Sequence, residues 1–490
     1  MLNSRSVGKR RSRASIVLVT LLLAPMAGSN NTTHAANADD DISEEEIRFE
    51  SGDVTLHGTV LVPNGASPGR KPAMALVHGS GPGPRELRRS DAEAFARGGI
   101  VTLIYDKRTK GYSESGLGYR SYELLAQDAL AAVRTLRTHP EADPDAVGLW
   151  GRSEGGWVVP LAANRSEEVA FVVLVGASGV SPARQVSWFL ESQLRHLGVS
   201  GSMVEVVSRT GIRVQVGTDG FAEGYHDPVG PLERLRQPVL AMWGEKDRIV
   251  PPAESARIVQ GALERGGNEH YTIRFIPDAD HGLYSSPDGF VPGDAPAPEY
   301  PETVGSWVEQ VVSGQEPGPS VAGPAPEQAR PSRPITPLAW WESGWVQLGA
   351  MVLPALAFAS YLVVAFGAAI ACRTGAPAQE ALEATMWVRR WAFWLACAGL
   401  ATVLGFVCYF GFLIVTAASA VGPVVAGRPI PWLALQALSV ATCAFTLLLA
   451  ASWRSSPKVL AGADRARTTV LFAGGTLFAA WAGYWGLLSP

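Results

Sequence analysis

Residues 147–163, VGLWGRSEGGWVVPLAA, decide the fold. The apolar residues 147–150 are typical of a buried strand and helical spacing resumes at 157, so a tight glycine-flanked turn must join the two. Residues 151–155 of that turn fit the pattern G-x-S-x-G. Glycines two positions before and after Ser153 leave room for a strained backbone that lifts the serine Oγ clear, and the following helix N-terminus favours developing negative charge. The stretch therefore predicts Ser153 as a nucleophile for acyl transfer.

Strands and helices alternate on both sides of this turn, which indicates an α/β fold with a mostly parallel sheet. Residues 181–232 interrupt the alternation and are interpreted as a short cap inserted above the sheet. The expected elements are a hairpin at 46–50 and 54–61, strands at 73–77, 101–105, 147–150, 170–175, 239–243 and 271–276, and helices at 86–97, 122–138, 157–163 and 304–312.

A serine hydroxyl needs a base to take its proton and a third group to orient that base. Asp247 follows the strand expected at 239–243, and His281 follows the next one, at 271–276. Parallel strands place their carboxyl ends at one edge of the sheet, so both residues are predicted to meet Ser153 there. We expect His281 to be the base and Asp247 its partner, with Asp278 or Asp280 as the alternative acid.

The segment 78–83, HGSGPG, follows the strand expected at 73–77. It can be a plain glycine-rich turn, or an oxyanion loop whose main-chain N–H acts together with the N–H of Glu154. We favour the second interpretation, with the Ser80 N–H as donor and Gly81 as the next choice. The side chain of Glu154 either holds the turn by hydrogen bonds or faces the pocket and recognises a substrate amino group. The segment lacks the GK[ST] of a phosphate-binding loop.

Together with VHGSGPG at 77–83 and YDKRTKGYSES at 105–115, the stretch 147–163 resembles the α/β-hydrolase superfamily. The similar branch contains exported esterases and prolyl-oligopeptidase-like or serine-aminopeptidase-like hydrolases with a Ser-Glu-Gly-Gly elbow, and the resemblance covers about residues 45–313. It implies a serine hydrolase with Ser153, Asp247 and His281 as triad and Ser80 plus Glu154 as oxyanion donors. Arg152 departs from the histidine often found in the elbow.

The C-terminal third has a different composition from the rest of the chain. Residues 336–490 hold only 12 of the 86 charged side chains, and they contain all four cysteines. Uncharged apolar runs at 348–371, 391–416, 432–452 and 468–488 each exceed the ~20 residues needed to cross a bilayer. The first and third connecting loops carry seven cations and the second only one. The sequence predicts a membrane domain at 338–490 with four spans, and an extracytoplasmic domain before it.

The N-terminal segment, residues 1–38, is predicted to be a signal peptide cleaved after Ala38. A cationic start is followed by about twelve apolar residues, a run too short to span a bilayer comfortably. An A-x-A site follows this run. An uncleaved signal anchor is the main alternative, and a twin-arginine signal is less favoured. The hydrolase domain is assigned to 39–313, and the proline-rich segment 314–337 is expected to be a semi-extended tether.

These features predict a serine hydrolase in the cell membrane, anchored by multiple spans and cleaving ester or related acyl bonds of a small molecule. A peptidase on short peptides is the close alternative. A non-catalytic scaffold or transporter is the second alternative. It is disfavoured because all triad members are present and no Asp, Glu, Lys, Arg or His lies within a span. No metal or organic cofactor is expected. The anionic domain between residues 37 and 335 argues against nucleic acid as partner.

Overall fold

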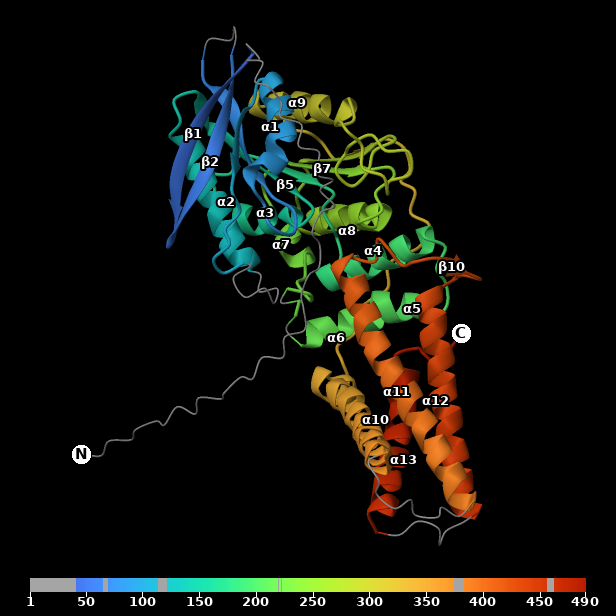
Figure 1. Ribbon diagram of the computed structural model, residues 1–490. Helices are drawn as coiled ribbons and strands as arrows, with labels where there is room; N and C mark the ends of the chain where they lie inside the picture. Colours follow the sequence, from blue (N-terminus) through green and yellow to red (C-terminus); the bar gives the residue numbers. More distant parts are fainter. Residues whose placement is uncertain are drawn as a thin grey trace, which may run out of the picture.

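The computed structural model describes residues 41–64, 69–112, 121–218, 220–221, 223–373, 383–455 and 462–490. The predicted signal peptide, residues 1–38, lies outside the described residues, as does much of the first and third loops of the membrane domain. Figure 1 shows an α/β domain at one end of a bundle of long helices.

A nine-stranded sheet forms the centre of the α/β domain, in the order β1-β2-β4-β3-β5-β6-β7-β8-β9. The hairpin β1–β2 is antiparallel and β2 pairs antiparallel with β4, whereas every later pair is parallel. The predicted α/β fold with a mostly parallel sheet is therefore confirmed. The strands are β1 Ile42–Ser51, β2 Val54–Pro63, β3 Lys71–Val77, β4 Val101–Tyr105, β5 Ala142–Arg152, β6 Val172–Val175, β7 Val239–Gly244, β8 Tyr271–Ile276 and β9 Ser320–Ala322.

Helices cover both faces of the sheet, because successive strand residues point to opposite sides. Along β3, Met74 and Leu76 belong to the core under α1 and α9, whereas Ala73, Ala75 and Val77 face the core under α2, α3 and α8. The helix bounds are α1 Arg89–Arg97, α2 Tyr122–Arg137, α3 Gly155–Ala163, α8 Pro252–Arg265 and α9 Glu299–Val312, preceded by the short η1 Arg85–Arg88.

The segment predicted to be a cap is helical. It comprises α4 Pro182–His196, α5 Ser202–Glu205, η2 Val206–Thr210 and α6 Gly211–Gly217, and α7 Val229–Glu233 returns the chain to the sheet. Its apolar side chains, such as Leu194, Met203 and Ile212, do not join either sheet core. They share one continuous core with residues of the long helices, including Phe406 and Trp485. The cap therefore packs on the helical bundle as well as on the hydrolase domain.

The bundle consists of α10 Gly344–Arg373, α11 Glu383–Val415, α12 Ile430–Ser455 and α13 Gly462–Tyr484. Among the described helices, three are long and apolar enough to cross a membrane, at Gly344–Ile370, Met386–Val415 and Ile430–Arg454. They coincide with the first three predicted spans. The fourth predicted span, 468–488, coincides largely with α13, which is less apolar because of its Gly, Thr and Trp residues. Four spans are thus not shown, and the fourth stays a prediction.

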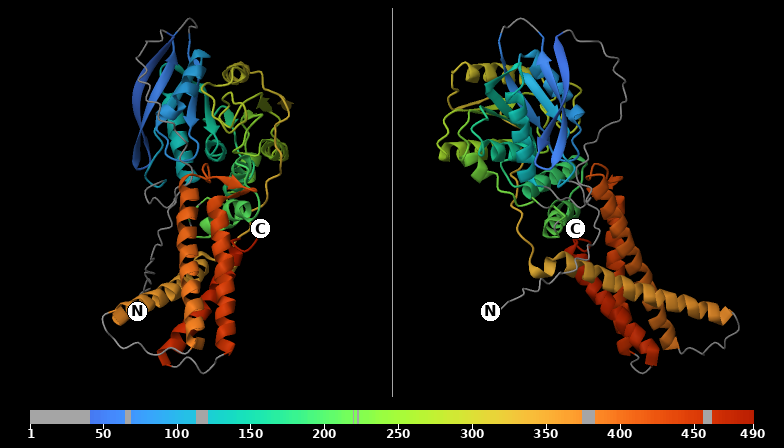
Figure 2. Two further views of the ribbon diagram at one scale, coloured as in Figure 1. Left: turned by 45° about the vertical axis from the view of Figure 1, so that its right-hand side comes forward. Right: turned by 90° about the vertical axis from the view of Figure 1, so that its left-hand side faces the viewer.

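The cap lies against the end of the bundle nearest the hydrolase domain (Figures 1 and 2). Polar contacts join the two parts there. The Ser200 N–H donates to Gly427 O at 2.7 Å, beside the hairpin β10 Val424–Val425 and β11 Arg428–Pro429. The Ser202 N–H donates to Pro490 O at 3.0 Å. Arg213 binds both carboxylate oxygens of Glu342, at 2.6 Å each, just before α10. The second loop and the C-terminal residue therefore both lie against the cap.

The segment 314–337 runs along the hydrolase domain and does not form a detached tether. Its residues 320–322 add the edge strand β9 to β8. Trp188 of the cap donates to Arg330 O at 3.1 Å, and the Ser332 hydroxyl donates to Glu254 at 2.7 Å. Prolines fix an extended backbone whose free carbonyls and N–H groups find partners on α4 and α8, so the segment is held in place.

The ion pair between Arg213 and Glu342 provides a test of the docking between cap and bundle. Both side chains are largely buried, at 18% and 7% exposure. An Arg213→Met substitution keeps the apolar stem but leaves a buried carboxylate unpaired, at a cost of about 1.5 to 3 kcal/mol. We expect a lower thermal unfolding midpoint of the full chain in detergent. Arg209→Met, which removes an exposed pair in the same cap, is the matched control. Equal midpoints for the two variants would contradict this docking role.

Candidate active site

Ser153 lies in the turn between β5 and α3, at the carboxyl edge of the sheet. Its φ of 56° places it in the left-handed region, where a residue with a side chain is strained. The Ser153 N–H donates to Val175 O, at the end of the neighbouring strand β6, at 2.8 Å. The side chain is half-buried. The strained turn is thus pinned to the sheet while the hydroxyl stays accessible.

The glycines of the motif are required by close packing around this turn. A Cβ on Gly151 would lie 2.5 Å from Gly155 O, and a Cβ on Gly155 would lie 2.8 Å from Val77 O. Because real Cβ contacts are essentially never shorter than 3.0 Å, any larger residue would push β5, α3 and β3 apart. The pattern G-x-S-x-G therefore reflects the crossing of three backbone segments beneath the serine.

The structure brings Asp247 and His281 together. Asp247 follows β7 and is fully buried, and its Oδ2 lies 2.8 Å from Nδ1 of His281, which follows β8. The other oxygen, Oδ1, accepts from the N–H groups of Ile249 and Val250 at 2.9 Å each. A carboxylate held in this way fixes the imidazole with its proton on Nδ1, which leaves Nε2 as the acceptor.

The His281 ring packs against the backbone just after β6, next to the residue that holds the Ser153 turn. A Cβ on Gly176 would be 2.8 Å from His281 Cε1, and Gly176 directly follows Val175, the residue that accepts the Ser153 N–H. His281 is only 6% exposed, and its Nε2 has no hydrogen-bond partner among the described residues. A general base needs a nitrogen that is free to accept the serine proton. The contact between such a base and the serine is often long in the free enzyme and tightens in the reacting complex.

The alternative acids are used elsewhere. Asp278 pairs with Lys246 at 2.6 Å on the surface. Asp280 accepts the N–H groups of Gly282 and Tyr284, at 2.7 and 3.0 Å, and so shapes the loop that carries His281. Neither carboxylate contacts the imidazole as Asp247 does. Within the described residues, no group of three or more His, Cys, Asp or Glu side chains converges as a metal site would.

In the loop after β3, the two candidate oxyanion donors, Ser80 and Gly81, differ in whether their N–H group already has a partner. The Gly81 N–H donates to the Tyr112 hydroxyl at 3.0 Å. The Ser80 N–H has no hydrogen-bond partner within the described part of the chain. This favours Ser80, the first choice from the sequence, over Gly81 as an oxyanion donor. Gly79 touches the turn itself, since a Cβ there would lie 3.4 Å from the Ser153 Cβ.

Glu154 belongs to a buried network that sequence reasoning missed. It is fully buried, and its Oε1 accepts from Lys107 Nζ at 2.6 Å and from the Tyr112 hydroxyl at 2.8 Å. Lys107 also donates to Gly79 O at 2.7 Å and to Gly81 O at 3.3 Å. The carboxylate therefore holds the elbow and the loop together. Lys107 and Tyr112 lie in the run 105–115 that carries the resemblance, but nothing in the sequence indicates that they are buried.

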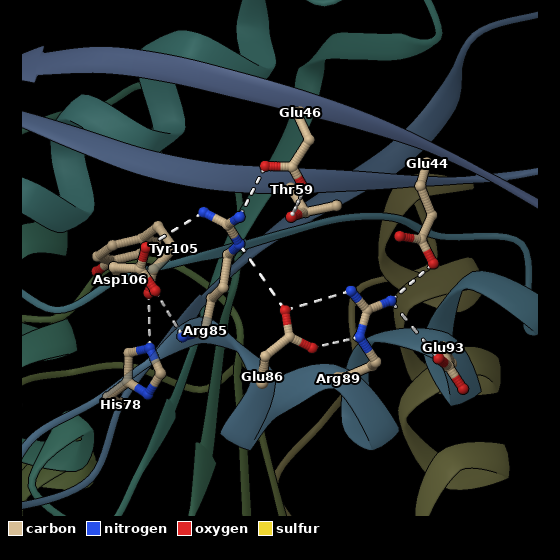
Figure 3. Close-up of polar contacts among 10 residues, drawn as sticks. All are labelled: Glu44, Glu46, Thr59, His78, Arg85, Glu86, Arg89, Glu93, Tyr105 and Asp106. Atoms are coloured by element: carbon tan, nitrogen blue, oxygen red, sulfur yellow. Dashed lines mark hydrogen bonds and ion pairs between the residues drawn. The ribbon is translucent and has the colours of Figure 1, made fainter. Parts of the chain in front are cut away.

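A second network anchors the start of this loop (Figure 3). The His78 Nε2–H donates to Tyr105 O at 2.7 Å. Arg85 donates from its backbone to Asp106 at 2.9 Å, and its guanidinium reaches Asp106 and Glu46 of β1 at 3.2 and 2.7 Å. Arg85 is thereby engaged in a structural network rather than exposed toward a substrate.

His78 generates a prediction about pH. Burial, with Arg88 nearby, lowers the pKa of His78 from its ordinary 6.5 to about 3. The unfolded chain therefore binds more protons between these values, so stability falls as the pH drops through this window, by up to about 1.4 kcal/mol per unit. We expect His78→Gln, which keeps a donor for Tyr105 O, to flatten the loss of thermal stability between pH 6.5 and 4.5. Parallel stability curves for variant and parent would show that His78 does not titrate in this way.

The comparisons with known proteins show similarity to esterases and peptidases over this part of the chain. The model of the prolyl oligopeptidase family matches residues 99–290. The esterase EstD of Thermotoga maritima is 28% identical over 262 residues, covering 48% of this chain and 61% of the esterase. Dipeptidyl peptidase 4 of Trichophyton equinum is 25% identical over 257 residues, covering 49% of this chain and 31% of the peptidase. The chain thus spans less than two thirds of the length of these relatives.

Solved structures show similarity over the same part. A dienelactone hydrolase from Anabaena variabilis is 18% identical and covers 55% of this chain and 98% of its own, with a TM-score of 0.36. The conclusion about the fold rests on this chain's own sheet order and elbow and on its sequence relatives. These show that the chain contains a serine-hydrolase domain with the α/β-hydrolase fold.

Proposed function

We propose that this protein is an exported, membrane-anchored serine hydrolase that cleaves ester or related acyl bonds through an acyl-enzyme. The observation that carries the proposal is the strained Ser153 turn at the same edge of the sheet as a buried His281–Asp247 pair, in which the His281 Nε2 has no hydrogen-bond partner among the described residues. The order of these residues along the chain, with each at the end of its own strand, supports the same conclusion.

In this mechanism the Ser153 Oγ attacks the acyl carbonyl carbon while His281 Nε2 takes the hydroxyl proton. Asp247 stabilises the imidazolium that forms. The N–H groups of Ser80 and Glu154 bind the oxyanion of the tetrahedral intermediate, and His281 then passes its proton to the leaving oxygen. A water molecule, activated by the same imidazole, attacks the acyl-enzyme and releases the acid.

Esters are favoured over peptides because Glu154 is turned inward. Its Oε1 is occupied by Lys107 and Tyr112, so the carboxylate serves the elbow rather than a substrate amino group. The peptidase alternative is tested directly. Comparing the hydrolysis of acyl esters with that of aminoacyl amides separates the two functions.

The triad makes a direct prediction. Ser153→Ala removes the nucleophile, so both labelling by a fluorophosphonate and hydrolysis of p-nitrophenyl acetate should fall to background. Asp247→Asn, which leaves the imidazole in the wrong tautomer, should lower kcat by about 10⁴. Asp278→Asn is the matched control, because this exposed carboxylate lies near the same loop but contacts only Lys246, and it should retain most activity. Persistent labelling of Ser153→Ala would remove Ser153 from the mechanism.

We further propose that the membrane domain has four spans and that residues 1–38 direct the hydrolase domain out of the cytoplasm. The chain enters α10 at the end of the bundle nearest the cap, and Pro490 lies against the cap at the same end. The number of crossings between those points must then be even, which makes α13 the fourth. Its 23 residues extend about 35 Å, enough to cross.

The side chains at the two ends of the bundle are those expected for this membrane orientation. Trp340 and Trp341 are exposed just before α10, at the cap end, where amphipathic rings favour the membrane interface. At the opposite end, Arg389 pairs with Asp464 at 3.3 Å beside Arg465 and Arg467. The excess of cations at the end distant from the hydrolase domain supports a cytoplasmic location for that end.

Cysteine labelling tests this topology. In a variant without the four native cysteines, Ala420→Cys in the second loop should react with a membrane-impermeant maleimide in intact cells. Ala463→Cys at the start of α13 should react only after lysis, since both positions are exposed in the structure but lie at opposite ends of the bundle. A third variant, Ser489→Cys just after α13, tests the fourth span itself: this position is exposed in the structure and should react in intact cells, as Ala420→Cys does. Protection of Ser489→Cys until lysis would contradict four spans.

A further inference from the structure

We propose that Lys107 is a positioning residue for the oxyanion site: its ammonium group orients and polarises the peptide unit that presents the Ser80 N–H to the reacting carbonyl. This inference rests on the proposed function, because an oxyanion must form for the orientation to matter. Lys107 is distant from the nucleophile in sequence. It lies in the loop after β4, against the segment 78–83.

The decisive contact is with Gly79. Lys107 Nζ lies 2.7 Å from Gly79 O, and its side chain is only 4% exposed. The Gly79 carbonyl and the Ser80 N–H belong to one planar trans peptide unit, in which the two groups point in opposite directions. Fixing the carbonyl toward Lys107 therefore fixes the N–H toward the opposite side. The Ser80 N–H is unpaired there among the described residues.

The same contact strengthens the donor. A positive charge against the carbonyl oxygen draws electron density through the amide, so the N–H on the other side becomes a stronger hydrogen-bond donor. The effect is largest in a buried site, where water does not screen the charge. Lys107 thus acts on the oxyanion through a peptide bond without touching it.

Lys107 also links the two donors. Its ammonium lies 2.6 Å from the Glu154 carboxylate, and the backbone N–H of Glu154 is the second proposed oxyanion donor. The buried Glu154 charge would repel a developing oxyanion if it were unpaired, and Lys107 neutralises it. One ammonium group therefore holds both donor segments in register and removes an opposing charge from beneath them.

Tyr112 completes the arrangement. Its hydroxyl accepts the Gly81 N–H at 3.0 Å and lies 2.8 Å from Lys107 Nζ. The peptide after Ser80 is thereby turned away from the reacting atoms. With the Gly81 N–H bound to Tyr112 and the Gly79 carbonyl bound to Lys107, these contacts favour the Ser80 N–H as the donor.

The test measures the full chain in detergent with an ester substrate and a fluorophosphonate, whose phosphoryl oxygen occupies the oxyanion site. Lys107→Met should lower kcat by about 10²-fold, toward the loss caused by removing an oxyanion donor, with KM changed little. The rate of fluorophosphonate labelling should fall in parallel. Lys71→Met, which breaks a surface pair with Glu141 at the other end of β3, should leave both rates unchanged.

A double variant separates orientation from charge balance and from misfolding. Lys107→Met removes the cation that faces the buried Glu154 carboxylate, so the variant with Lys107→Met and Glu154→Gln together restores neutrality and is expected to regain thermal stability. Its kcat should stay low, because Gly79 O still lacks the ammonium group. Addition of ethylammonium to Lys107→Ala should restore part of kcat in a saturable way.

Three outcomes would overturn the role of Lys107: wild-type kcat in Lys107→Met, recovery of full kcat in the neutral double variant, or a change in KM alone. The proposed function is judged separately, by the loss of labelling in Ser153→Ala. A parent protein that labels at Ser153 while Lys107→Met labels equally fast refutes this inference and leaves the hydrolase intact.

Discussion

The turn at Ser153 is the constraint on which the whole site depends. A left-handed residue between β5 and α3 is possible here only because Gly151 and Gly155 let three backbone segments cross at contact distance. The Ser153 N–H then pairs with Val175 O, which sets the serine beside Gly176 and hence beside His281. The same turn directs the Glu154 side chain inward. The nucleophile, its base and the buried network are consequences of one strained conformation.

The inward-facing Glu154 carboxylate explains why Lys107 and Tyr112 lie beneath the elbow. A buried Glu154 without a partner would destabilise the domain, so the fold supplies Lys107 and Tyr112 from the loop after β4. In that loop Lys107 lies against the segment 78–83, where its backbone N–H donates to Gly83 O and its ammonium group donates to Gly79 O. The Lys107 side chain thus stabilises the buried Glu154 charge and also positions the oxyanion loop.

Local signals in the sequence were enough to predict the fold and to place Ser153, Asp247 and His281, because each lies at the end of an apolar strand and parallel strands end at one edge. Lys107 and Tyr112 could not be singled out, since a lysine buried against a carboxylate looks the same in sequence as one on a solvated surface. The proline-rich segment 314–337 misled for a related reason: composition predicts an extended backbone but not the partners that hold it.

The bundle could be predicted as apolar helices, but its contact with the cap could not, because the cap residues have ordinary core composition. In the structure, Met203 and Ile212 share one core with Phe406 and Trp485. Separating the two parts would expose this apolar surface on both sides, at roughly 25 cal/mol for each Å². The helical bundle therefore completes the core of the cap and holds the cap in a fixed position. A bundle that only tethered the hydrolase would have no need of this shared core.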